Sequence, residues 1–127
     1  MQIRIYYEDT DTGGIVYHSN YLNFCERARS EVFFSRGLNP VLENGHFVVK
    51  KLEANFIASA KLGDIVEVKT KLLEQKGASF TLEQTIYKEQ TKLFVLNVML
   101  VYLSFDGKIQ KIDSKIAHLI EQLFNIK

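Results

Sequence analysis

The pattern of apolar and polar residues predicts one long helix in the first third of the chain. Apolar residues recur every three or four positions between residues 20 and 36, at Tyr21, Phe24, Cys25, Ala28 and Val32. Charged residues lie between them, which is the pattern of an amphipathic helix with one buried face. Ser19 or Asn20 is expected to cap its start, and Gly37 is expected to end it.

Four later segments are predicted to be β-strands, at residues 46–58, 64–74, 79–88 and 93–103. In the first of them, four apolar residues are expected to share a face: Val48, Leu52, Ala54 and Phe56. In the second, apolar residues alternate with Glu67, Lys69 and Lys71, which indicates a strand with one face in water.

The last of these segments, residues 93–103, is apolar on both faces except at Asn97. A strand of this kind needs cover on both sides. We therefore expect the long helix to cover one face and another subunit to cover the other.

The remaining elements complete an α+β order. Residues 2–7 are predicted to form a first strand, Gly107 a turn, and residues 113–125 a final helix capped by Asp113 or Ser114. The order β-α-β-β-β-β-α predicts an antiparallel sheet wrapped around one long helix. At 127 residues the chain is long enough for one core, so residues 1–127 are expected to form a single domain.

Composition and charge narrow the class of protein. The net charge of +1 gives no general attraction to nucleic acid or to a membrane surface. The longest apolar run, residues 93–103, is too short for a transmembrane helix of about 20 residues. Residues 1–4 lack the apolar core of a signal peptide, which predicts a cytoplasmic protein. The single cysteine, Cys25, excludes an intramolecular disulfide, and its position on the apolar side of the helix predicts an inert thiol.

An acidic loop with two glycines precedes the helix and carries the main candidate for chemistry, Asp11. Free backbone N–H groups and the helix dipole at the following helix start favour developing negative charge. A carboxylate beside such a site could attack an ester-like carbonyl while the backbone stabilises the oxyanion, which predicts a hydrolase. The alternative for Asp11 is a turn aspartate bonded to its own backbone, and Glu8 and Asp9 are interpreted as turn or solvent-facing acids.

The same loop does not predict a metal site. Asp9, Asp11 and Gly13 superficially resemble the start of a calcium-binding EF-hand. However, Gly13 and Asn20 occupy the fifth and twelfth positions, where that loop requires oxygen ligands. The three histidines are scattered and give no zinc spacing. The sequence also has no Gly-x-Ser-x-Gly nucleophile elbow.

Residues 9–21 read Asp-Thr-Asp-Thr-Gly-Gly-Ile-Val-Tyr-His-Ser-Asn-Tyr, and Glu26-Arg27-Ala28-Arg29 follows on the helix. This combination resembles the signature of the hotdog-fold acyl-CoA thioesterases, and among them the YbgC-type branch of the 4-hydroxybenzoyl-CoA thioesterase family. A Gly63-Asp64 pair at the start of a strand also fits. One departure is that members often carry a proline ahead of that pair, whereas residues 58–62 here contain none.

The resemblance implies a hotdog fold and an enzyme that hydrolyses an acyl-CoA without a metal or other cofactor. It implies that Asp11 acts as nucleophile or general base, and that the backbone N–H of His18 binds the thioester oxygen. Gly14, Val16 and Tyr17 are expected to contact the substrate. It further implies homodimers joined edge to edge, with active sites at the interface, that assemble into a homotetramer. The acyl donor could be coenzyme A or acyl carrier protein.

Several alternatives stay open at the level of the sequence. A second hotdog branch uses a helix glutamate, for which Glu26 and Glu31 are the candidates, although the match at Asp11 argues against it. A hotdog hydratase or dehydratase would pair its histidine and acid in a different placement, and the acidic loop before the helix fits thioesterases better. Separately, the side chain of His18 could position the substrate or water, hold Asp11 in the ionised state, or be structural. Outside enzymes, the alternative is a non-catalytic acyl- or partner-binding hotdog protein linked to phospholipid or envelope machinery. Any of five lysines could contact coenzyme A phosphates: Lys50, Lys51, Lys61, Lys76 and Lys92.

Overall fold

The computed structural model describes residues 1–124, and residue 125, at which the predicted final helix ended, lies outside them. The elements are β1 (Gln2–Arg4), the 3-10 helix η1 (Tyr7–Asp9), α1 (Asn20–Phe34), β2 (His46–Phe56), β3 (Ile65–Gln75), β4 (Ser79–Lys88), β5 (Thr91–Leu103) and α2 (Ser114–Phe124). The predicted helices and strands are therefore present, with ends that match or shift by at most three residues.

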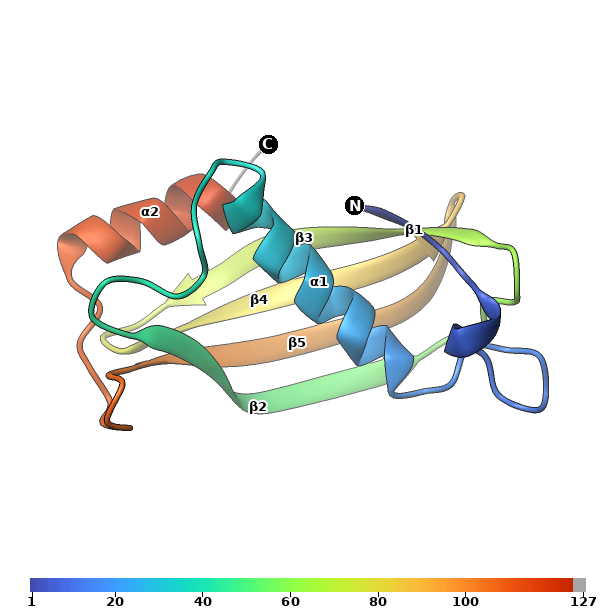
Figure 1. The fold of residues 1–127 in the computed structure, drawn as a ribbon, viewed down its shortest axis with the longest axis horizontal. Helices are drawn as coiled ribbons and strands as arrows, with labels where there is room; N and C mark the ends of the chain where they lie inside the picture. The colour runs from blue at the N-terminus through green and yellow to red at the C-terminus, as the bar shows by residue number, and fades with distance from the viewer. Residues whose placement is uncertain (125–127) are drawn as a thin grey trace.

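One antiparallel sheet with the strand order β1-β3-β4-β5-β2 forms the body of the fold. Helix α1 crosses one face of this sheet, and its N-terminal end lies near the β2 edge (Figure 1). Helix α2 packs near β3 at the opposite end of α1. The predicted arrangement of an antiparallel sheet around one long helix is confirmed.

The core lies between α1 and the sheet. Its fully buried members include Phe24, Cys25, Leu82, Ile86, Phe94 and Val98 from α1, β4 and β5, and Ile120 and Leu123 from α2. On the other face of β5, Asn97 is exposed, and Val95 and Met99 are half-buried. The predicted cover by the helix is confirmed for one face, and cover of the second face by another subunit stays a prediction.

The prediction for the face of β2 was wrong at Val48. A β-bulge between Val49 and Lys51 shifts the register against β5, so that Val48 pairs with Val101 and Val49 pairs with Leu100. Because residues paired across strands share a face, the helix-facing set of β2 is Phe47, Val49, Leu52, Ala54 and Phe56. A bulge reverses the alternation on one side of it, so a strict two-residue count misplaces the residues beyond it.

Helix α1 ends earlier than the predicted residue 36, through a motif built on Gly37. Gly37 N–H donates to the Phe34 carbonyl, and Leu38 N–H donates to the Phe33 carbonyl, each at 3.0 Å. This pair of hydrogen bonds is a Schellman motif, which requires a left-handed residue, and Gly37 has φ +71°. The role of Gly37 as the stop signal is confirmed. At α2, Asp113 is the cap, because its Oδ1 accepts Ile116 N–H at 2.9 Å.

Candidate functional site

The loop that carries Asp11 is a tight turn held by its own backbone. Asp11 N–H donates to the Ile15 carbonyl at 2.9 Å, and Gly14 N–H donates back to the Asp11 carbonyl at 3.0 Å. Gly14 has φ +79°, a left-handed conformation that a residue with a side chain adopts only with strain. The sequence Thr-Gly-Gly thus allows the reversal that projects Asp11 between η1 and α1.

The carboxylate of Asp11 is exposed and takes part in this turn. Its Oδ1 accepts Gly13 N–H at 2.8 Å, and a Cβ added at Gly13 would lie 3.2 Å from the same oxygen. The turn-forming role weighed as the alternative for Asp11 is therefore present. That role occupies Oδ1, and within residues 1–124 the other carboxylate oxygen has no hydrogen bond. Asp11 can hold its loop and still offer one oxygen to a ligand.

The start of α1 offers backbone N–H groups that no side chain caps. Ser19 occupies the cap position but makes no side-chain hydrogen bond to the helix, so only its place was predicted correctly. Asn20 N–H bonds the Tyr17 carbonyl, and Leu22 N–H bonds the Ser19 carbonyl. The N–H of His18 has no acceptor among the described residues. A donor of this kind, at the positive end of a helix, is suited to bind an oxyanion.

A cavity of about 270 Å³ brings the candidate residues together; we call it the loop–helix cavity. Its walls come from the Asp11 loop, the start of α1 and the segment after β2, and they consist of Asp11, Ile15, Val16, His18, Tyr21, Phe56, Ile57, Ala58 and Ser59. The lining includes apolar and aromatic side chains, such as Val16, Phe56 and Ile57, beside the polar residues Asp11, His18 and Ser59. That is the usual composition of a site that holds an apolar group and acts on a polar bond.

Three of the five predicted site residues line this cavity, namely Asp11, Val16 and His18. Gly14 and Tyr17 are not among the lining residues, so their expected contact with a substrate stays a prediction. The ring of Tyr17 lies 4.6 Å from the imidazole of His18, and the ring of Phe56 lies 6.3 Å from it on another side. The His18 side chain thus lies near two aromatic rings and is exposed to solvent.

Of the two roles indicated for Asp9, a turn acid or a solvent-facing acid, the structure shows the turn role. Asp9 is 6% exposed, its Oδ2 accepts Tyr6 N–H at 2.8 Å, and its Oδ1 accepts Asn20 Nδ2–H at 2.9 Å. These bonds form η1, so the predicted first strand, residues 2–7, ends at Arg4. They also join η1 to the first turn of α1, a contact that the sequence does not reveal because it depends on the chain returning at Asn20.

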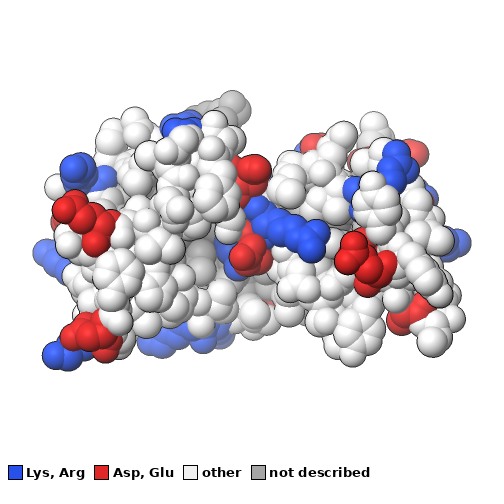
Figure 2. Space-filling model, in the orientation of Figure 1, with Lys and Arg blue, Asp and Glu red and all other residues white. Residues whose placement is uncertain are grey.

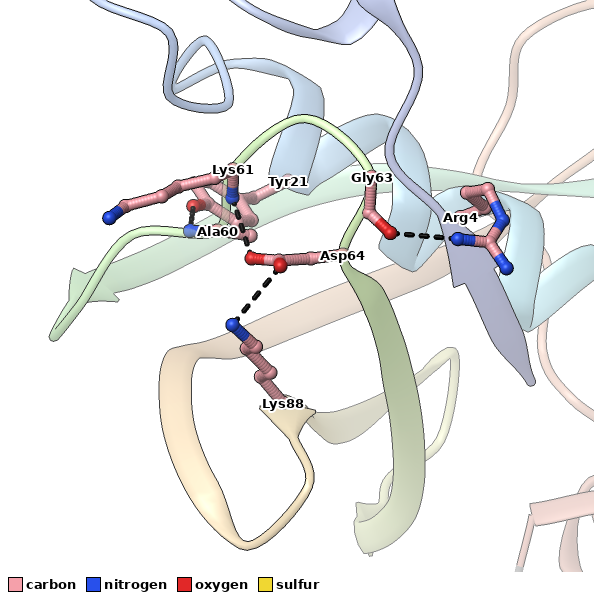
Figure 3. Close-up of polar contacts among 7 residues, drawn as sticks. All are labelled: Arg4, Tyr21, Ala60, Lys61, Gly63, Asp64 and Lys88. Atoms are coloured by element: carbon pink, nitrogen blue, oxygen red, sulfur yellow. Dashed lines mark hydrogen bonds and ion pairs between the residues drawn. The ribbon is translucent and has the colours of Figure 1, made fainter.

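Tyr21 is a second residue of the site that sequence analysis missed. Its hydroxyl accepts Ala60 N–H at 3.1 Å, which links α1 to the turn between β2 and β3 (Figure 3). The asparagine and tyrosine that end the motif of residues 9–21 therefore fix two different loops around one cavity. The only signal in the sequence was their place beside Ser19 at the helix start.

The other candidate groups lie away from the loop–helix cavity. Glu26 and Arg29 line a separate cavity of about 310 Å³ between α1 and β2, and Glu31 lies on a third, near α2. Burial raises the pKa of the Cys25 thiol to about 12, against the opposing effect of Arg29. That thiol is protonated at neutral pH and is a poor nucleophile.

Charge, metal and membrane features of the described residues add no further site. Basic and acidic side chains are interspersed over the face in Figure 2 rather than gathered into one patch. Residues 1–124 hold no group of three or more histidine, cysteine or acidic residues arranged to bind a metal. No helix of that part of the chain is long and apolar enough to cross a membrane. The geometry does not choose among the five candidate lysines.

Comparison with known proteins gives consistent matches. Residues 13–95 match the family model described as "Thioesterase superfamily". Acyl-CoA thioesterase YbgC of Helicobacter pylori is 47% identical over 87 residues, which cover 68% of this chain and 65% of that protein. The same comparison with Acyl-CoA thioesterase YbgC of Haemophilus influenzae gives 44% identity over 97 residues, 72% of this chain and 70% of that protein.

Solved structures match over more of the chain. The "Probable Thioesterase" of Bartonella henselae superimposes with a TM-score of 0.83 at 32% identity, over 89% of this chain and 97% of that one. The sequence match to the Helicobacter pylori protein, by contrast, spans slightly less than two thirds of that protein's length. Within the chain, His18 and Tyr21 lie inside the matched range of residues 13–95, and Asp11 precedes it by two residues.

Proposed function

Because the chain belongs to the thioesterase superfamily, with the hotdog fold of that family and YbgC proteins among its relatives, we propose that it hydrolyses an acyl-CoA thioester to a free acid and coenzyme A. The observation that carries the proposal is the loop–helix cavity, in which the Asp11 carboxylate and the start of α1 border one space. Residues 1–127 would form one thioesterase domain, and its cytoplasmic location stays a prediction.

In this proposal the thioester carbonyl oxygen accepts a hydrogen bond from His18 N–H. That N–H has no acceptor within residues 1–124, and the dipole of α1 adds to its attraction for negative charge. As the carbonyl carbon becomes tetrahedral, negative charge develops on its oxygen, so the hydrogen bond is stronger in the transition state than in the ground state. In this proposal the side chain of His18, which lines the cavity near Tyr17 and Phe56, serves to shape it.

Asp11 then acts in one of two ways, as a general base or as a nucleophile. As a general base, its free oxygen takes a proton from a water molecule, the resulting hydroxide attacks the carbonyl carbon, and the C–S bond breaks to release the coenzyme A thiolate. As a nucleophile, the same oxygen attacks the carbon directly, thiolate leaves, and water hydrolyses the acyl-enzyme anhydride. One turnover in ¹⁸O-labelled water tests for the nucleophilic route. Label appears on Asp11 only if water attacks the aspartyl carbon of the anhydride, whereas a general base sends all of the label to the free acid.

The test of the function is thiol release from a panel of acyl-CoAs of graded chain length, aliphatic and aromatic, with matched acyl carrier protein thioesters alongside. Turnover of at least one member well above the uncatalysed rate is expected. If none is hydrolysed although binding is measurable, the protein is instead a non-catalytic acyl-binding hotdog protein. The preferred member of the panel defines the acyl group and the donor, which the lining of the cavity alone does not identify.

We expect the protein in solution to be a homodimer, assembled into a homotetramer. Strand β2 is an edge of the sheet, and three of its helix-facing apolar residues are about half exposed: Val49 44%, Leu52 44% and Phe56 53%. An unpaired edge with exposed apolar side chains favours pairing with another chain. Light scattering at micromolar concentration should give a mass of two or four chains, and Leu52→Lys should lower it. A monomeric wild type would contradict the edge-to-edge dimer and an active site at its interface.

A further inference from the structure

The hydroxyl of Tyr21 is buried at a junction between α1 and the loop that follows β2. Tyr21 is 3% exposed, and Ala60, whose N–H it accepts at 3.1 Å, is fully buried. An amide N–H buried in this way costs free energy unless it is paired, and within residues 1–124 the Tyr21 oxygen is its acceptor. Burial raises the pKa of Tyr21, so the hydroxyl is a neutral phenol at physiological pH.

Ala60 in turn holds the loop of Asp11. Its carbonyl accepts Val16 N–H at 3.0 Å, and the adjacent residues Lys61 and Ile15 form a β-bridge. Ile15 is the residue whose carbonyl accepts Asp11 N–H. A continuous chain of hydrogen bonds therefore runs from the phenol of Tyr21 through Ala60 to the turn that carries the carboxylate.

Residues 61–64, which follow Ala60 in the turn between β2 and β3, are held by contacts that do not involve α1. Asp64 accepts Lys61 N–H at 2.8 Å and pairs with Lys88 at 3.0 Å, and Arg4 donates to the Gly63 carbonyl at 2.8 Å (Figure 3). These contacts tie residues 61–64 to β1 and β4. Among the described residues, Tyr21 makes the hydrogen bond between α1 and the turn from β2 to β3, at Ala60. The segment before Ala60, residues 57–59, lines the loop–helix cavity opposite the helix start.

We propose that Tyr21 is a positioning residue of the proposed thioesterase reaction: its hydroxyl, through Ala60, fixes the Asp11 loop and the cavity wall of residues 57–59 relative to the His18 N–H. The inference rests on the proposed function, because it assigns no new reaction. Hydrolysis needs the attacking oxygen and the oxyanion donor on opposite sides of one carbonyl carbon, and those two groups come from different elements. A misplacement of about 1 Å between such groups can cost roughly a hundredfold in rate.

The test is Tyr21→Phe, which removes the hydroxyl and keeps the ring that stacks on Phe94 at 5.1 Å between centroids. We expect kcat to fall about tenfold or more with KM changed less than about threefold, because binding surface is kept and alignment is lost. Hydrogen exchange at the Ala60 amide should become much faster. Two controls accompany it: Tyr87→Phe, a phenol on β4 outside the cavity, and Thr70→Val, which removes a partly buried hydrogen bond from Gln84.

The outcomes separate the inference from the function on which it rests. If Tyr21→Phe exposes the Ala60 amide but keeps the wild-type kcat, or if Thr70→Val lowers kcat as much, the Tyr21 bond is merely structural and the inference is overturned. If the Ala60 amide exchanges at the wild-type rate in the variant, the hydrogen bond is not formed in solution, which also overturns it. A wild type that hydrolyses no member of the acyl panel removes the function and the inference together.

Discussion

Replacing Asp11 by asparagine is expected to lower kcat for acyl-CoA hydrolysis by about a hundredfold or more, or several kcal/mol on the barrier. An amide is a negligible base and a poor nucleophile, so either proposed route is blocked. The fold should survive, because the amide oxygen can still accept Gly13 N–H as Oδ1 does at 2.8 Å. Affinity for acyl-CoA should be largely retained, since the apolar walls of the loop–helix cavity are unchanged. Thiol release and binding, measured separately, check both parts.

The structure decides which control matches this substitution. Asp9→Asn would be the natural choice from the sequence, but Asp9 is buried and accepts two N–H donors, so an amide there would place N–H against N–H. Glu8→Gln is a better control, because Glu8 is exposed and belongs to the same segment. It should leave kcat within about twofold, a difference of less than 0.5 kcal/mol on the barrier.

A second comparison concerns His18. If the essential group is its backbone N–H, His18→Ala should cost much less than Asp11→Asn, since the main chain is retained. An equally large loss would assign the chemistry to the imidazole. Near-normal turnover of Asp11→Asn, combined with loss of activity on substitution of Glu26 or Glu31, would instead support the helix-glutamate mechanism. Those two glutamates line other cavities, so we expect neither substitution to have that effect.

Periodicity was sufficient to predict the architecture, and it failed where the backbone departs from regular geometry. The helix-facing residues of β3 and β4 follow a strict alternation from Val66 to Leu72 and from Phe80 to Ile86. In β2 the bulge after Val49 breaks that alternation, and Lys50 at this position is not a residue that signals a bulge. The register of β2, which decides which of its side chains face α1, is set by pairing with β5, about 50 residues later in the chain.

In the candidate site, too, the sequence predicted the features that depend on local structure and missed those that depend on distant contacts. Asp11 and His18 could be named from the sequence because their local setting, a glycine turn followed by a helix start, determines their backbone environment. The burial of Asp9 and the role of Tyr21 could not, because Tyr21 meets Ala60 across 39 positions and Asp9 meets Asn20 across 11. A motif read from sequence thus identified the groups that we propose to be reactive, but not the residues that hold them.

Gln84→Leu is expected to destabilise the protein by about 2–4 kcal/mol, the largest effect of a single substitution in the core that keeps a similar volume. Gln84 is fully buried on the helix-facing side of β4, among apolar neighbours such as Leu82 and Ile86. Its Nε2 donates to the Cys25 carbonyl at 2.9 Å and to Thr70 Oγ1 at 3.1 Å. Its Oε1 accepts from Arg29 Nη1 at 2.9 Å.

The size of this effect comes from the group that stays behind. Arg29 has no carboxylate within 4.0 Å among the described residues, and burial lowers its pKa, so Gln84 is the acceptor that stabilises a partly buried guanidinium. Leucine at position 84 leaves that charge without an acceptor, which costs more than the loss of an ordinary hydrogen bond. Thr70→Val, which removes only one of the contacts of Gln84, should cost about 1 kcal/mol.

Urea unfolding of a double-mutant cycle tests this explanation. Arg29→Leu removes the charge, so Gln84→Leu added to it should cost far less than in the wild type, and the two effects should fail to add by more than about 1 kcal/mol. Fully additive effects would mean that Gln84 acts through its contacts with Cys25 and Thr70 alone. A single Gln84→Leu variant as stable as the wild type would show that the polar network contributes no net stability, as some buried ion pairs do not. We expect neither, because the guanidinium cannot lose its charge at any pH at which the protein is folded.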